Sequence, residues 1–89
     1  MNRRDKLLKR FYGNPKDFTF DELKAVFSAY GFRLDNKGAT SGSRVEFVND
    51  SLNLSYIAHK PHPGNTVKAY AMRQAIDYFE RCGLKQDSK

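Results

Sequence analysis

The sequence has few of the residues that cross-link a protein or anchor it in a membrane. Its 89 residues include one cysteine, Cys82, and no tryptophan. A single cysteine excludes an internal disulfide bond and is typical of a reducing compartment. No apolar run approaches the roughly 20 residues of a membrane-spanning helix. The basic N-terminal residues 1–6 are not followed by the apolar segment of a signal peptide. We therefore expect a soluble, cytoplasmic protein that makes no membrane contact.

The chain is also too short for most enzyme architectures. Its 89 residues, 39% of them hydrophobic, allow one small domain that spans residues 1–89. The 7 phenylalanines and 5 tyrosines suffice for a small core but not for a core that also encloses a cofactor. This excludes doubly wound nucleotide-binding folds, barrels and multidomain enzymes, and we expect no cofactor.

Positive charge is the first indication of function. The chain has 16 lysine and arginine residues against 10 aspartates and glutamates, which gives a formal net charge of +6. A small domain with this excess carries a positive surface potential that attracts polyanions such as nucleic acids. Many small basic domains bind nothing anionic, so a role of the charge in solubility remains the alternative.

Hydrophobic periodicity predicts three helices. The first covers residues 3–11 and has a basic outer face. Thr19 and Glu22 form a capping-box signature for the second helix, residues 20–30, because each side chain can bond the other residue's backbone N–H. The third helix covers residues 66–82. Its predicted buried face consists of Met72, Ala75, Ile76 and Phe79, with Cys82 as a further candidate at its end.

Alternating apolar and polar residues predict three strands between the second and third helices. These strands contain Phe32 and Leu34, then Val45 and Phe47, and then Leu54, Tyr56 and Ala58. Short turns between them indicate an antiparallel meander. The predicted fold class is therefore α+β, with a three-stranded antiparallel sheet and the helices on one face. Residues 85–89 are predicted to form a polar tail.

Both histidines of the sequence lie where the third predicted strand ends, at positions 59 and 62. The two prolines at 61 and 63 favour extended or polyproline backbone here, in which residues three apart lie about 9 Å apart along the axis. That separation does not suit a shared metal ion, whose histidine ligands bind at about 2.0–2.1 Å. We therefore expect no metal site.

Acid–base chemistry fits these histidines better. Cleavage of RNA without a metal requires a base, an acid and cations around the phosphate, and imidazole transfers protons near neutral pH. His59 has Lys60 beside it and Arg44 on the preceding predicted strand. The alternative is that the imidazole caps backbone groups at the proline turn. Both interpretations stay open for His59, whereas the structural one is preferred for His62.

A second candidate site is the segment Thr40-Ser41-Gly42-Ser43-Arg44. Small hydroxyl residues around a glycine can present donors to a phosphate, and Arg44 can bind it with two parallel hydrogen bonds. The same pattern also suits an ordinary loop that enters a strand. Lys68 and Arg73 on the last predicted helix extend the basic face, with solvated surface charge as their alternative role.

Several short motifs follow one another in a characteristic order along the chain. They are Gly31-Phe32, Thr40-Ser41-Gly42-Ser43-Arg44, Val45-Glu46-Phe47, His59-Lys60-Pro61-His62-Pro63-Gly64-Asn65 and Lys68-Ala69-Tyr70. Their order and spacing, over a span from Pro15 to Leu84, resemble the HicA family, the small mRNA-cleaving toxins of HicA–HicB toxin–antitoxin systems. The resemblance implies a fold like the double-stranded-RNA-binding domain, α-β-β-β-α, here preceded by an additional helix within residues 1–14. It also implies RNA as the substrate and a HicB-type antitoxin protein as the partner that covers the active face.

One position departs from the family pattern. Typical members carry a catalytic histidine directly after a Gly-Ser pair, and this chain has Arg44 there. Arginine stays protonated and cannot act as a general base. The first hypothesis is therefore a metal-free ribonuclease in which Arg44 anchors the phosphate and His59 transfers protons. Ser43 and Lys60 would assist in positioning, and His62, Lys68 and Arg73 would bind RNA. The alternatives are a non-catalytic RNA-binding module and a protein-interaction domain.

Overall fold

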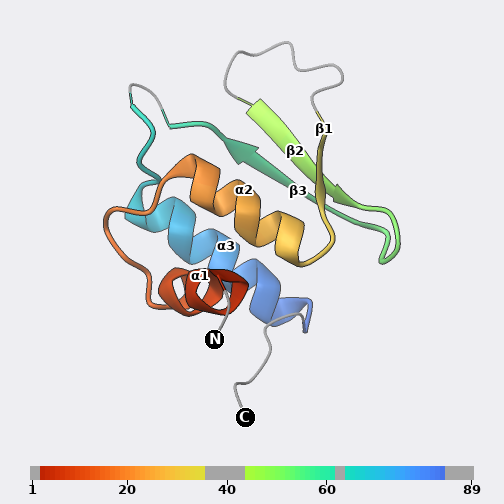
Figure 1. Cartoon of the computed structure of the whole chain (residues 1–89). Helices are drawn as coiled ribbons and strands as arrows, with labels where there is room; N and C mark the ends of the chain where they lie inside the picture. The colour runs from red at the N-terminus through yellow and green to blue at the C-terminus, as the bar shows by residue number, and fades with distance from the viewer. Residues whose placement is uncertain (1–2, 36–43, 62–63, 84–89) are drawn as a thin grey trace.

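The computed structural model describes residues 3–35, 44–61 and 64–83 of the chain. Its elements, in chain order, are α1 (Arg3–Tyr12), α2 (Phe20–Ala29), β1 (Arg33–Asp35), β2 (Arg44–Asn49), β3 (Leu54–His59) and α3 (Ala69–Arg81) (Figure 1). The predicted α+β class and the predicted order of elements are confirmed. The predicted phosphate-binding Ser43, the predicted RNA-binding His62 and the polar tail at 85–89 lie outside the described residues.

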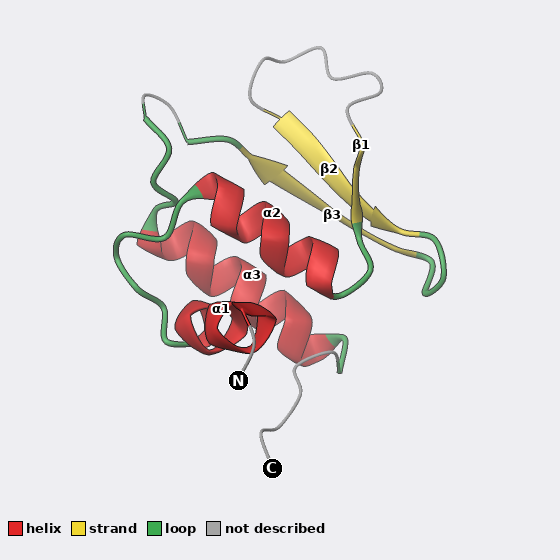
Figure 2. Cartoon of the chain, in the orientation of Figure 1, coloured by secondary structure: helices red, strands yellow, loops and turns green. Residues whose placement is uncertain are grey.

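The three strands form one antiparallel sheet in the order β1-β2-β3. The helices lie on one side of this sheet, as predicted (Figure 2). On the helix side, Leu34, Phe47 and Tyr56 lie opposite one another across the three strands. The side chains of β2 alternate between buried and more exposed positions, which is the period of a strand with one covered face.

The core joins the helices to the sheet through stacked aromatic rings. The ring of Phe27 on α2 lies parallel to that of Phe47 on β2, with 4.1 Å between the ring centroids. It also contacts Tyr56 of β3 at 5.3 Å and Phe79 of α3 at 4.8 Å. Aromatic pairs at such distances contribute about 0.5–1.5 kcal/mol each beyond the area that they bury.

Helix α2 begins and ends as its local sequence predicts. Thr19 is the N-cap: its hydroxyl accepts a hydrogen bond from the Glu22 N–H, and the Glu22 carboxylate accepts one from the Thr19 N–H. Gly31 follows the C-cap with φ +91°, a conformation that side chains other than glycine rarely adopt. A Cβ at Gly31 would also lie 3.3 Å from Nδ2 of the buried Asn49. That amide donates to the Tyr30 carbonyl, so the end of α2 is bonded to the end of β2.

The predicted start of the last helix at residue 66 is wrong, because α3 begins at Ala69. Residues 65–67 instead run alongside residues 18–20, with two backbone hydrogen bonds of 2.8 Å between the segments. This pairing keeps residues 65–67 out of the helix, and Lys68, the N-cap residue of α3, has extended backbone. The starts of α2 and α3 therefore lie next to each other.

Helix α1 is part of the core rather than an appendage to it. Phe11 is fully buried, and Leu7 and Leu8 pack against the same cluster. The Tyr12 and Tyr30 hydroxyls are hydrogen-bonded at 2.7 Å. Burial and this bond raise the pKa of Tyr12 far above its usual range.

Candidate functional site

The two residues that the sequence analysis assigns to catalysis lie directly opposite each other in the sheet. In the register of β2 and β3, Arg44 pairs with His59. Both side chains are exposed and alternate with buried or half-buried neighbours, so both project from the sheet face away from the helices. We call this face the outer face. It carries Arg33, Asp35, Arg44, Glu46, Val48, Ser55, Ile57 and His59.

The outer face is arranged in rows across the strands. One row consists of Arg44 and His59, and the next consists of Asp35, Glu46 and Ile57. Side chains directly opposite each other in an antiparallel pair have Cβ atoms about 4.5–5.5 Å apart. A guanidinium group and an imidazole ring are therefore close enough to contact one ligand, with a carboxylate in the adjacent row.

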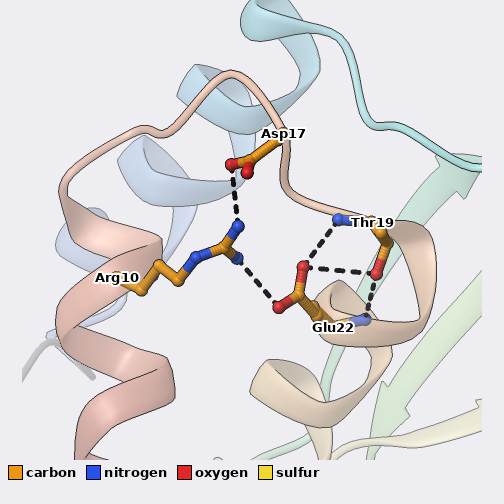
Figure 3. A network of polar contacts seen from close by, with 4 residues as sticks. All are labelled: Arg10, Asp17, Thr19 and Glu22. Carbon is orange, nitrogen blue, oxygen red and sulfur yellow. Dashed lines mark hydrogen bonds and ion pairs between the residues drawn. The ribbon is translucent and has the colours of Figure 1, made fainter.

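Four other cations among the described residues form ion pairs with carboxylates: Arg10, Lys24, Arg33 and Arg81. The clearest case is Arg10, which donates to Asp17 at 2.7 Å and to Glu22 at 2.8 Å (Figure 3). Arg10 thus connects α1, the following loop and the capping box of α2. The Thr19 N–H and Arg10 together hold the pKa of the Glu22 carboxyl below its usual value.

Arg33, at the far end of the outer face, also has carboxylate partners. Its guanidinium group donates to Asp50 at 2.9 Å and lies 3.6 Å from Asp35. The bond from Arg33 lowers the pKa of the Asp50 carboxyl. Arg81 on α3 likewise pairs with Asp77 at 2.9 Å. The charges of Arg33 and Arg81 are therefore balanced locally.

The predicted nucleic-acid-binding cations differ from these. Among the described residues, Arg44, Lys60, Lys68 and Arg73 have no ion pair and no side-chain hydrogen bond, and all four are exposed. An exposed cation without a carboxylate partner keeps its charge available for an anionic ligand.

These four cations do not all lie on the outer face. Arg44 is on it, whereas Lys60 follows β3, one residue beyond His59. Lys68 is the N-cap of α3, and Arg73 lies in the second turn of that helix. The start of β2, the end of β3 and the starts of α2 and α3 lie toward one end of the molecule (Figure 1). The structure thus pairs Arg44 with His59 and places the three other cations on the segments that follow β3.

The site predicted from the sequence omits one ionisable group. Glu46 lies two residues after Arg44 on β2, and its half-buried side chain is on the same face. The alternation that places Arg44 on the outer face places Glu46 there as well. The sequence pattern was therefore sufficient to include Glu46 in the candidate site. In the described part of the chain, the carboxylate of Glu46 has no ion pair or hydrogen bond.

Residues 3–35, 44–61 and 64–83 contain no group of three histidine, cysteine, aspartate or glutamate side chains arranged to hold a metal ion. Within the same ranges no helix is both long enough and apolar enough to cross a membrane. Comparison of the chain with protein-family models, with curated proteins and with solved structures finds no match.

Proposed function

We propose that this protein is an RNA-binding ribonuclease of the toxin type, which cleaves mRNA without a metal ion. The observation that carries the proposal is the pairing of Arg44 with His59 on the outer face. Cleavage by the adjacent 2′-hydroxyl group requires proton transfer and stabilisation of the charged phosphate. Imidazole transfers protons near neutral pH, and guanidinium binds a phosphate with two parallel hydrogen bonds.

The order of the elements supports the same proposal. Without α1, the chain has the order α-β-β-β-α of the double-stranded-RNA-binding domain, to which we assign the fold. We also assign the chain to the HicA family, on the motifs given above. A HicB-type antitoxin is then the protein partner, and it neutralises the toxin by covering the outer face. The cytoplasm is the proposed compartment, because it contains mRNA and keeps a single thiol such as Cys82 reduced.

The distribution of the cations supports RNA as the ligand. Lys60, Lys68 and Arg73 follow the paired residues in the chain, and none of them has a carboxylate partner among the described residues. Lysines and arginines that neutralise phosphates provide most of the sequence-independent affinity for nucleic acids. The proposed roles are phosphate binding by Arg44, proton transfer by His59 and binding of the flanking RNA by these three cations.

The test is cleavage of RNA by the purified protein in EDTA. Wild type is expected to produce fragments with 2′,3′-cyclic phosphate ends. His59→Ala should lower the cleavage rate by about 10²–10⁴-fold, the usual contribution of a general acid or base, with little change in RNA affinity. Arg44→Ala should lower both the rate and the affinity. Loss of wild-type cleavage in EDTA would contradict the metal-free mechanism, and undiminished cleavage by His59→Ala would contradict the role of His59.

A second candidate function is RNA binding without cleavage. One observation favours it: Arg44 occupies the position where typical HicA members have a catalytic histidine. This function predicts salt-sensitive binding that leaves the RNA intact. A protein-interaction domain, the third class, would show no RNA affinity even at low salt.

A further inference from the structure

We propose that Glu46 is the second catalytic group of this site and acts as the general base, while His59 acts as the general acid. The inference rests on the proposed ribonuclease function and deepens it. A single imidazole cannot both take the proton from the attacking hydroxyl and protonate the leaving oxygen in the same step. A second ionisable group beside Arg44 and His59 would perform one of these two proton transfers.

The register of the sheet places Glu46 where such a group is needed. Glu46 lies two residues from Arg44 on β2 and is diagonal to His59 across the β2–β3 pair. Diagonal neighbours in an antiparallel pair are about 7–8 Å apart. A phosphate bound to Arg44 would therefore have the carboxylate and the imidazole on different sides. An in-line displacement needs this separation, because its attacking and leaving oxygens lie on opposite sides of the phosphorus.

The chemistry balances with these three side chains. The Glu46 carboxylate accepts the proton of the 2′-hydroxyl group, whose oxygen forms a bond to phosphorus. The bond between phosphorus and the 5′-oxygen breaks, and the His59 imidazolium donates its proton to that oxygen. The products are a 2′,3′-cyclic phosphate and a 5′-hydroxyl end. Proton exchange with water then returns both side chains to their starting forms.

The neighbouring carboxylate of Asp35 does not fit this role. Asp35 lies opposite Glu46 on β1, but its carboxylate is 3.6 Å from the Arg33 guanidinium group. The neighbour of Glu46 on the other side is Ile57, which is 48% exposed and can neither neutralise nor bind a carboxylate. The Glu46 carboxylate thus has no competing ion pair within the described residues and is nearer to Arg44 along the sheet.

The pH dependence of the rate is the property that distinguishes a catalytic carboxylate from a structural one. A general base acts only when deprotonated and a general acid only when protonated, so the rate should pass through a maximum and decline on either side of it. The charged groups facing Glu46 are Arg33 and Asp35 from β1, Arg44 on its own strand and His59 from β3. We assign the decline at low pH to Glu46, and replacement of Asp35, the other carboxyl in this set, tests the assignment.

The experiment measures kcat, KM and the pH–rate profile with a short RNA in EDTA. Glu46→Gln has nearly the same shape and is expected to lower kcat about 10²–10⁴-fold, to leave KM within a few-fold of wild type and to abolish the acidic limb of the profile. Glu46→Asp, which keeps the carboxylate, should recover part of the rate. Asp35→Asn is the matched control, since it neutralises the adjacent carboxylate and should leave kcat near that of wild type and retain an acidic limb.

Two results would overturn the inference in distinguishable ways. If wild type is active and Glu46→Gln has the same kcat and acidic limb, then Glu46 has no part in the mechanism. The ribonuclease proposal would stand in that case. Wild type that leaves the RNA intact in the same assay would overturn both. Circular dichroism of each variant checks that a lost rate does not reflect unfolding, and the partial activity of Glu46→Asp provides a second check.

Discussion

Single aromatic residues decide how the sheet is held against the helices. Phe27 is fully buried and contacts rings from β2, β3 and α3, so it lies at the centre of the molecule. The outer face, with Arg44 and His59, is the reverse side of the same sheet. The geometry of the candidate site therefore depends on aromatic contacts on the opposite face of the sheet.

The first prediction concerns Phe27. Phe27→Leu keeps an apolar side chain but removes the aromatic contacts with Phe47, Tyr56 and Phe79, and it should lower the free energy of unfolding by about 1–3 kcal/mol. Urea denaturation followed by circular dichroism measures this change. Tyr70→Leu is the matched control: Tyr70 is 64% exposed, so its replacement should change the free energy by no more than about 0.5 kcal/mol. Equal effects of the two substitutions would show that Phe27 does not have this central role.

At the scale of elements, local signals could be read from the sequence and contacts between distant segments could not. The capping box and helical periodicity predicted residues 20–30 for α2, which covers Phe20–Ala29 with Tyr30 as its C-cap. The start of α3 was missed because it depends on pairing between residues 65–67 and residues 18–20; the bridged residues, Thr19 and Thr66, are 47 positions apart. Apolar spacing does not report such a contact. The extended backbone that precedes α3 is a tertiary effect.

The candidate site shows the same division. The alternation along β2 and β3 indicated which side chains share a face, because the period of a strand is two residues. That pattern fixed neither the partner of Arg44 across the strands nor the row occupied by Glu46, because both depend on the turn that joins β2 to β3. The register then placed Arg44 opposite His59, as the hypothesis of a shared site required. Arg33 has carboxylate partners and Arg44 has none among the described residues. This difference could be read only from the side-chain positions in the structure.

The connection between α1 and α2 gives a prediction about pH. The pKa of Glu22 is lowered, mainly by the hydrogen bond from the Thr19 N–H and also by Arg10. Because the pKa is lower in the folded state, the carboxylate stabilises the protein above its usual pKa of 4.5, and this contribution is lost as the pH falls through the folded-state value. Urea denaturation between pH 7 and pH 3 should therefore show a larger loss of stability in wild type than in Glu22→Gln.

Glutamine is the appropriate substitution for this test because it keeps the shape of the side chain and an oxygen that can accept the Thr19 N–H bond. It removes the negative charge that pairs with Arg10. Other carboxyl groups, such as that of Asp50, titrate in both proteins and cancel in the comparison. Parallel pH dependences of wild type and Glu22→Gln would mean that the Glu22 carboxylate contributes nothing to the acid sensitivity of the fold.

At the scale of the whole molecule, the net charge of +6 does not by itself indicate where an anion binds. Every lysine or arginine adds equally to the net charge, but only some of the described cations have carboxylate partners. Arg10, Arg33 and Arg81 have carboxylate partners at 2.7–2.9 Å. Arg44 and Lys68 have none among the described residues. If RNA binds where the charge is not balanced, these two groups should respond differently to substitution.

The salt dependence of RNA binding tests this division. Each lysine or arginine that neutralises a phosphate steepens the fall of log K with log salt concentration by about 0.7–0.9. Arg44→Ala, Lys60→Ala and Lys68→Ala should each reduce the slope by about this amount. Arg81→Ala should leave it unchanged, because this guanidinium group is bound to Asp77. All four substitutions lower the net charge by one, so equal effects would show that RNA responds to the total charge of the protein. A reduction confined to the first three would locate the bound RNA at the end of the molecule where β2 begins and β3 ends.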